Sequence, residues 1–263
     1  MTTVNEVLQF LLRLAPAEMK EDWDHIGLQC GHGDHTVHRI LVALDPFLDV
    51  VEEAEACDAE LIVTHHPLLF FPTHTVNDSN AVGRTLLCAI EQDKAIISMH
   101  TNLDSAPGGV NDCLAARLGL QNCTVLAPAG TDAQGRPYGL GRVGTVAETT
   151  LEDFAQHVKK ALGCTGLRYA SAGKLVRKVA VGGGACGEFT KAAAALGCDT
   201  FVTGDLKYNG FWDGVDLGVN LIDAGHFPTE NPVCDYLLEQ LQVQFPTVQV
   251  EKSKQHFDII QYL

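Results

Sequence analysis

Several common features are missing from this sequence, and each absence excludes a class of protein. No stretch of the 263 residues reaches the roughly 18 consecutive apolar residues that a membrane-spanning helix needs. Basic residues are scarce, with 18 Lys and Arg against 33 Asp and Glu, so the formal net charge is -15. Nucleic acids and anionic membranes bind clustered Lys and Arg, so we expect neither as a partner.

The nine cysteines lack the spacing of a structural metal site. No C-x-x-C pair occurs, and the scattered positions fit neither a disulfide framework nor a zinc ribbon. Free thiols indicate a reducing compartment. Residues 1–16 have helical apolar spacing with Thr3 and Glu6 as a capping box, and they lack the basic start and cleavage site of a signal peptide. We therefore expect a cytoplasmic protein.

Short β-prone runs alternate with helical segments, which is typical of an α/β fold with crossover connections. In the first part of the chain the predicted strands are 39–45, 61–66 and 94–100, and the predicted helices are 48–56, 80–92 and 110–118. In the later part the predicted strands are 177–184, 200–205 and 219–226, and the predicted helices are 149–161 and 188–196. The glycine-rich residues 130–148 between the two parts predict a loop or a hairpin.

The two parts of the chain show a weak internal similarity. The strands of the first read LVALD, IVTHH and IISMH, and those of the second read VAVGGG, FVTGD and LIDAGH. We predict an α/β protein of two similar halves, residues 1–125 and 126–234. The C-terminal residues 235–263 could complete the first half.

Histidines and carboxylates gather at three predicted strand ends. They are His65 with His66, His100 with Asp104 four residues later, and His226 with Glu230 four residues later. In open α/β sheets, ligands bind at the carboxyl ends of the strands. Mixed imidazole and carboxylate ligation suits Zn, Mn, Fe, Co or Ni ions. We therefore predict a metal site formed by these strand ends.

The adjacent pair His65 and His66 bears on the number of ions. Neighbouring side chains on a strand point to opposite faces, which would separate the two rings. Pro67 cannot donate to a sheet, so it helps the chain to leave the strand at this point. From a loop, two imidazoles can serve two ions about 3.5–4 Å apart. We expect two divalent transition-metal ions.

A glycine-rich turn offers a competing motif. Gly182, Gly184 and Gly187 satisfy G-x-G-x-x-G after a predicted strand, and Asp205 ends the next strand. This pattern is a dinucleotide fingerprint and indicates nicotinamide-dependent oxidoreduction as a minor alternative. The same turn, with Gly184 at its centre, could form an anion cradle facing the metal site or simply allow a tight turn. Further candidates for lining a substrate pocket are Trp23, Asp24, Asp45, Lys207 and Tyr208.

Six segments occur in a recognisable order. They are WDHIGLQCG, LVALD, LIVTHHPLLF, HTNLDSAPGGVND, VTGDLKY and LIDAGHFPTENP. Together they resemble the GTP cyclohydrolase I type 2 family, also called the Ngg-interacting-factor-three-like family, from about residue 20 to residue 235. Two positions depart from the family pattern: His25 replaces an Asn, and Asn209 stands where many members have His.

The resemblance implies a fold, a metal centre and an activity. Members look like two similar α/β halves enclosing a dinuclear metal site, and this chain resembles the short form without an inserted central domain. Matching the motifs places the metal ligands at His65, His66, Asp104, His226 and Glu230. Glu230 would be the bridging carboxylate, and His100 an adjacent group that could move protons. The family name implies opening of the GTP imidazole ring with release of formate, giving dihydroneopterin triphosphate.

The resemblance also implies an assembly and leaves a rival function open. Family members form toroidal hexamers, so a homo-oligomer is expected, with a small-molecule substrate such as a purine nucleotide. The rival is a non-catalytic protein that delivers or senses metal with the same five ligands. Fold and site are shared more widely than reaction, so the sequence does not decide between them.

Overall fold

The computed structural model describes residues 1–263 as two compact units. The first unit is Met1–Leu103 with Val233–Phe257, and the second is Asp104–Pro232 with Asp258–Leu263. The division at Leu103 differs from the predicted boundary near residue 125. The reason is that α5 (Val110–Arg117) packs Leu114 and Ala115 into the core of the second unit.

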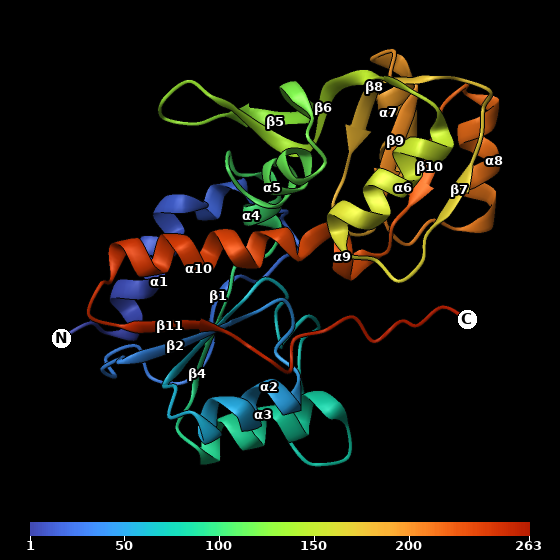
Figure 1. The fold of residues 1–263 in the computed structure, drawn as a ribbon. Coiled ribbons are helices and arrows are strands. Elements are labelled where there is room, and N and C mark those ends of the chain that lie inside the picture. The colour runs from blue at the N-terminus through green and yellow to red at the C-terminus, as the bar shows by residue number, and fades with distance from the viewer. The chain divides into compact units, whose positions relative to one another are not determined.

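The first unit is built on a five-stranded mixed sheet (Figure 1). Its strand order is β1-β4-β3-β2-β11, and only β1 runs antiparallel to its neighbour. The strands are β1 (Gly27–Cys30), β2 (Arg39–Ala43), β3 (Leu61–Thr64), β4 (Ala95–Ser98) and β11 (Gln249–Lys252). The helices are α1 (Val4–Leu14), a 3₁₀ turn at Ala17–Met19, α2 (Leu48–Ala56), α3 (Ala81–Glu91) and α10 (Pro232–Gln244).

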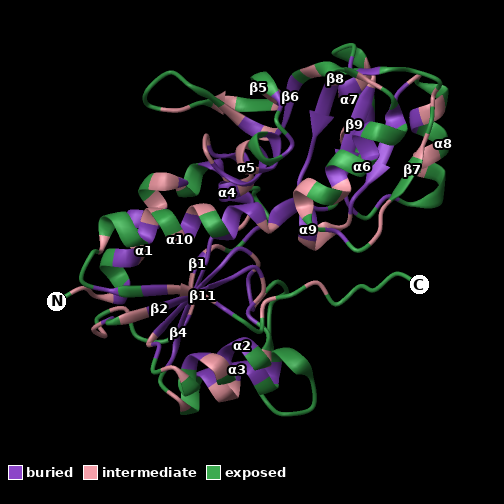
Figure 2. Cartoon of the chain, in the orientation of Figure 1, coloured by how far each residue is buried: buried purple, intermediate pink, exposed green.

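Local sequence explains the ends of several of these elements. Thr3 caps α1 and Glu6 completes the capping box, which confirms the predicted signal. Asn80 accepts a hydrogen bond from Gly83 N and caps the start of α3. The strands β3 and β4 are buried along their whole length, as parallel strands covered on both faces are. Figure 2 shows this burial at the centre of the sheet.

The second unit is built on a six-stranded mixed sheet (Figure 1). Its strand order is β5-β6-β8-β9-β10-β7, with only β8, β9 and β10 parallel to one another. The strands are β5 (Gln121–Thr131), β6 (Pro137–Thr149), β7 (Arg168–Ala170), β8 (Val176–Val181), β9 (Thr200–Thr203) and β10 (Asn220–Asp223). Besides α5, the helices are α6 (Leu151–Leu162), a 3₁₀ turn at Gly187–Phe189, α7 (Thr190–Ala195), α8 (Tyr208–Asp216) and α9 (His226–Glu230).

Four strands follow the same order in both sheets. In the first unit, β1 pairs antiparallel with β4, and the next neighbours in the sheet are β3 and then β2, both parallel to β4. In the second unit, β7 pairs antiparallel with β10, and the next neighbours are β9 and then β8, both parallel to β10. The three consecutive parallel strands named here in each unit therefore end at one edge of their sheet, and the candidate site residues follow those ends.

Residues 130–148 form mostly strand, so of the loop and the hairpin that their composition predicts, the structure has the hairpin. They lie in the hairpin of β5 and β6, and only 132–136 form the connecting turn. Gly139 explains this outcome, because a Cβ there would come 2.2 Å from Ala127 O on the paired strand. Glycine permits this close approach of two backbones, so the glycines mark strand irregularities and not a loop.

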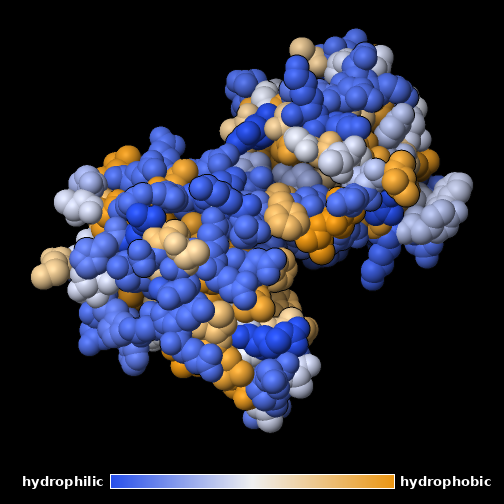
Figure 3. Space-filling view, turned by 60° about the horizontal axis from the view of Figure 1, so that its bottom comes forward, coloured by the Kyte–Doolittle hydropathy of each residue, from blue (hydrophilic) through white to orange (hydrophobic).

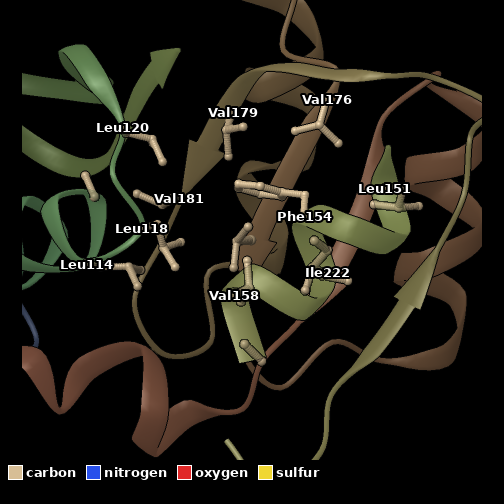
Figure 4. Packing of buried hydrophobic residues seen from close by; sticks show 14 of the residues in the cluster. Leu114, Leu118, Leu120, Leu151, Phe154, Val158, Val176, Val179, Val181 and Ile222 are labelled. Atoms are coloured by element: carbon tan, nitrogen blue, oxygen red, sulfur yellow. The ribbon is translucent and has the colours of Figure 1, made fainter. Parts of the chain in front are cut away.

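One of the two hydrophobic clusters of the second unit lies between α6 and the sheet. Phe154 and Val158 of α6 are buried with Val179 and Val181 of β8, and Figure 4 shows this packing at close range. Gly163 ends α6 in the left-handed conformation, as predicted. Outside the cores, hydrophilic residues cover much of the face shown in Figure 3. None of the helices combines the length and apolar character needed to cross a membrane.

Candidate metal centre

Three histidines of the first unit meet at the carboxyl ends of β3 and β4. His65 and His66 follow β3, and His100 follows β4, which is its parallel neighbour. One ring nitrogen from each of the three lies within 4.8 Å of the others. The three ring centroids are 4.9 to 5.7 Å apart. Sequence analysis predicts this set, and parallel pairing brings it together.

The strand ends before the two adjacent histidines. β3 stops at Thr64, whose hydroxyl donates to the carbonyl oxygen of His66 at 2.7 Å and holds the chain in a turn. The alternation of side chains along a strand therefore does not apply to His65 and His66. Their rings lie at 44° to each other. A ring nitrogen of His65 and one of His66 can thus both face the cluster with His100, as predicted from the exit of the chain at the end of the strand.

Hydrogen bonds assign the proton of each imidazole in the first unit. Nδ1 of His65 donates to Met99 O at 2.9 Å, and Nδ1 of His66 donates to Asp45 Oδ1 at 2.7 Å. Nδ1 of His100 donates to Asp24 Oδ1 at 3.0 Å. A carbonyl or carboxylate oxygen only accepts, so the proton of each neutral ring is on Nδ1. The lone pair of each ring is then on Nε2, which is the arrangement of metal-ligating histidines.

Asp24 anchors the end of β4 from a distant part of the chain. Its carboxylate is 2% exposed and also accepts from Thr101 N and Thr101 Oγ1, at 3.0 and 2.6 Å. Burial acts to raise the pKa of Asp24, but the hydrogen bonds from His100 and Thr101 outweigh it and hold the pKa well below its usual range. Asp24 is therefore an ionised partner that orients His100.

The second unit contributes one imidazole and two carboxylates. His226 and Glu230 begin and end the short helix α9, where i,i+4 spacing places them on one face. His226 Nε2 lies 3.1 Å from Glu230 Oε2, and an oxygen of Asp104 lies within 4.8 Å of a Glu230 oxygen. Asp104 lies in the five-residue helix α4 (Thr101–Ser105), which begins directly after His100, and HFPTE forms α9.

His226 is oriented in the same way as the other three histidines. Its Nδ1 donates to Asp205 Oδ2 at 2.7 Å, which leaves Nε2, 3.1 Å from Glu230 Oε2, as the nitrogen that faces the other candidate ligands of this unit. Asp205 follows β9, the strand next to β10, just as Asp45 follows β2, the strand next to β3. Each sheet thus pairs a histidine after one strand with a carboxylate after the neighbouring strand.

Gly184 packs directly against the ligand candidates of the second unit. Its φ is +64°, and a Cβ would lie 2.2 Å from Glu230 Oε1 and 3.0 Å from His226 Nε2. Its N–H donates to Thr229 Oγ1 at 3.0 Å, and the N–H of Gly183 donates to Asn111 Oδ1 at 3.0 Å. Glycine is needed here for close packing. The N–H groups that an anion cradle would use at Gly183 and Gly184 are already engaged.

Negative charge is concentrated around these carboxylates. Burial raises the pKa of the Cys186 thiol far above its usual range, and the charges of Asp104 and Glu230 raise it further. The Cys186 thiol is therefore neutral, and it donates to Gly183 O at 3.1 Å. A cation bound by Asp104 and Glu230 would relieve this repulsion. The donor set of oxygens and imidazole nitrogens fits the divalent transition metals expected from the sequence.

The remaining predicted site residues lie at the ends of elements. Asp45 is bonded to His66, so its position is that of an orienting group. Lys207 precedes α8 and Tyr208 begins it, and both side chains are exposed. Their contact with a substrate stays a prediction. The orienting roles of Asp24 and Asp205 are not anticipated by sequence analysis, although both carboxylates stand in the quoted motifs.

Comparisons with known proteins agree with this geometry. A family model described as Duf34/NIF3 (NGG1p interacting factor 3) matches residues 2–258. A Clostridium perfringens protein named GTP cyclohydrolase 1 type 2 homolog is 33% identical over 263 residues, covering 98% of this chain and 99% of its own. A Helicobacter pylori protein named GTP cyclohydrolase 1 type 2 is 31% identical over 260 residues, covering 99% of this chain and all of its own.

The fold is similar to that of a solved structure over its whole length. The crystal structure of a Bacillus cereus protein related to NIF3 superposes with a TM-score of 0.94 at 28% sequence identity. The alignment covers 100% of this chain and 99% of that one.

Proposed function

Because the chain belongs to the Duf34/NIF3 family, we propose that it is a dinuclear metal-dependent hydrolase of the GTP cyclohydrolase 1 type 2 kind. The observation that carries the proposal is the Nδ1 hydrogen bond that His65, His66, His100 and His226 share. A carbonyl or a carboxylate oxygen holds Nδ1 in all four, which fixes the orientation of each ring. Such outer partners are the usual companions of metal-ligating histidines.

The proposal assigns the ligands of the two units to one centre. The ligands are His65, His66, Asp104, His226 and Glu230. The chain crosses from the first unit to the second between Leu103 and Asp104, inside α4, and it returns after Pro232, just beyond α9. At 1.5 Å of helical rise per residue, Asp104 stays about 6 Å along the chain from His100.

The common strand order supports the predicted duplication. In the first unit His65 and His66 follow β3, and in the second unit His226 and Glu230 follow β10. Each parallel set carries an antiparallel strand at its edge, β1 beside β4 and β7 beside β10. Two similar halves, each supplying part of the ligand set, are a direct route to a two-ion centre. A carboxylate shared by two ions suits Glu230, which is 4% exposed.

Bound ions would supply an activated water and polarise the electrophile. The residues of the chain supply proton transfer and orientation. His100 keeps Nδ1–H on Asp24, so its Nε2 can accept a proton from water and later return it to the leaving nitrogen. For GTP, one water adds at C8 and opens the imidazole ring to a formamide, and a second water hydrolyses this formamide to release formate. We assign Lys207, which is exposed before α8, as a contact for the triphosphate.

The experiment that tests the proposal measures metal content and turnover together. We expect close to two transition-metal ions per chain and formate release from GTP, with both lost in a His65→Ala, Glu230→Ala double variant. A His157→Ala, Glu152→Ala variant is the matched control, because these two exposed residues of α6 carry the same side chains away from the candidate ligands. A chain that binds no metal, or that holds equal metal in both variants, would overturn the assignment.

Metal delivery or sensing is the second candidate, and the polar ligand set with its half-exposed His226 is compatible with it. A carrier should release its ions to a chelator quickly, whereas a hydrolase should release them slowly and keep them through many turnovers. Chelator-exchange rates measured beside formate release separate the two.

The nicotinamide alternative is disfavoured by the turn itself. The space beside Gly184, where a dinucleotide phosphate would bind, is occupied by the side chain of Glu230. The helix that follows the turn, α7, has only six residues, which is short for a dinucleotide-binding helix. The toroidal hexamer and the exclusion of nucleic acid stay predictions.

A further inference from the structure

Three aromatic side chains of the first unit are exposed and in contact with one another. Trp23 is 55% exposed, Phe70 45% and Phe71 75%. The rings of Trp23 and Phe70 are 5.6 Å apart, and those of Phe70 and Phe71 are 4.9 Å apart. Single exposed apolar residues are ordinary, but a contiguous aromatic group is typical of a binding surface.

This group touches the histidine set directly. The ring centroid of His100 lies 6.0 Å from that of Trp23 and 5.9 Å from that of Phe70, each in an edge-on arrangement. His100 in turn lies 5.3 Å from His65 and 5.7 Å from His66. A molecule that reacts beside His100 must therefore come within contact of Trp23 and Phe70. Phe71 touches Phe70 and lies farther along the patch.

Hydrogen bonds hold the two contacting aromatics in place. The residues on either side of Trp23 are tied to the end of β4, since Glu21 N donates to Thr101 Oγ1 at 2.9 Å and Asp24 accepts from His100 and Thr101. The segment carrying Phe70 is tied to the same region through Gln29, which accepts from Leu69 N at 3.4 Å and donates to His25 O at 2.9 Å. The aromatic faces are thus preorganised without a bound ligand.

From this arrangement we propose that Trp23 and Phe70 form a stacking surface for a planar heteroaromatic ring of the substrate, a purine or a pterin. The inference rests on the proposed function for its substrate, and it adds where the ring is bound and which residues select it. An aromatic face accepts the π-face of any base, and edge contact with His100 sets the ring beside the group that moves protons. A flat ring is the occupant that fits two aromatic faces adjoining a catalytic histidine.

The chain permits a direct optical test, because it has only two tryptophans. In a Trp212→Phe background, Trp23 is the sole fluorescent tryptophan, and Trp212 lies in α8 outside the aromatic group. Metal-loaded protein is titrated with GTP, with guanosine and with inorganic tripolyphosphate. We expect saturable quenching by GTP and by guanosine and none by tripolyphosphate, because only the first two carry the ring.

Matched variants then measure the contribution of each face. Trp23→Leu and Phe70→Leu should each weaken GTP binding and raise KM by roughly 5- to 150-fold, the range expected for loss of one base–aromatic stack. Phe71→Leu removes a more exposed ring that contacts neither Trp23 nor His100 directly, so its effect should be less than about threefold on the same scale. Metal content should be unchanged in all three, which excludes disruption of the histidines as the cause.

The outcomes separate this inference from the proposed function. Formate release from GTP without quenching of Trp23, and with KM unchanged in both variants, would overturn the stacking surface and leave the hydrolase standing. Saturable quenching by guanosine with no formate release would support the stacking surface and reject the reaction. If the variants change only the mass of the assembly, the patch is an interface between copies and the proposal is wrong.

Discussion

Removing the carboxylate behind His226 tests whether this imidazole is a metal ligand. In Asp205→Ala the acceptor of the 2.7 Å hydrogen bond from His226 Nδ1 is lost, while His226 and Glu230 keep their places at the ends of α9. The ring can then rotate, and its proton can move to Nε2. Either change takes the lone pair away from a bound ion.

The size of the effect follows from exposure. A hydrogen bond to a charged partner contributes about 1.5–3 kcal/mol, and loss of such an outer partner lowers metal affinity about 10–100-fold. The side chains of His226 and Asp205 are 35% and 51% exposed, so water weakens their bond. We therefore expect the lower end, about 1.4 kcal/mol or tenfold in the dissociation constant. Asp45→Ala should cost more, because His66 and Asp45 are only 21% and 24% exposed.

The assay is competition for Zn²⁺ against a chromogenic chelator, with the melting temperature measured on the same samples. Asp213→Ala is the matched control, because it removes an exposed carboxylate from α8 without touching a histidine. Asp205→Asn separates orientation from charge, since its amide oxygen can still accept from Nδ1. Equal affinity in Asp205→Ala and Asp213→Ala, both folded, would refute His226 as a ligand. Equal losses in Asp205→Asn and Asp205→Ala would show that charge and not orientation matters.

Three further predictions concern packing and pH. Gly184→Ala should abolish metal retention and lower the melting temperature, because the new Cβ would displace Glu230. As the control, Gly197→Ala has φ +73° and open space around it, so it should cost only about 1–2 kcal/mol of left-handed strain. Asp112→Ala should lower the free energy of unfolding, measured by urea denaturation, by about 3 kcal/mol, because it leaves the 3%-exposed Arg142 without its bidentate partner. As the control, Glu148→Ala removes the partner of the exposed Arg177 and should cost below about 1 kcal/mol. Burial, and to a smaller extent the nearby charge of Lys252, lowers the pKa of His256 from 6.5 to about 4. Between these two pH values the unfolded chain binds more protons than the folded chain, so stability should fall as the pH drops from 6.5 to about 4. His256→Gln, which keeps an acceptor for Leu44 N, should flatten the melting temperature over that range, and an unchanged slope would contradict the assignment.

Local chemistry was sufficient to locate most elements of the chain. Capping at Thr3 and Asn80, the glycine stop at Gly163 and the runs of β-branched residues all act within a few residues. For residues 130–148 the sequence left a loop and a hairpin open, because the glycines of the β5–β6 hairpin serve contacts with a paired strand, as at Gly139. No local pattern distinguishes such a glycine from one in a loop.

The sequence by itself determined which side chains stand at the strand ends. A buried β-run that meets a proline must leave the sheet, and His65 and His66 occupy that point wherever the strand is placed. The spacing of His226 and Glu230 likewise fixes one face of a short helix once it forms. These are consequences of backbone geometry over a few residues.

Only the tertiary structure decided which carboxylate orients which histidine. Asp24 reaches His100 across 76 residues, and Asp45 and Asp205 reach His66 and His226 across 21 residues each. These pairs depend on strand order, since β2 lies beside β3 and β9 beside β10. Strand order is set by packing of the whole unit and not by local periodicity. The proton positions that make these imidazoles suitable ligands therefore arise from the fold.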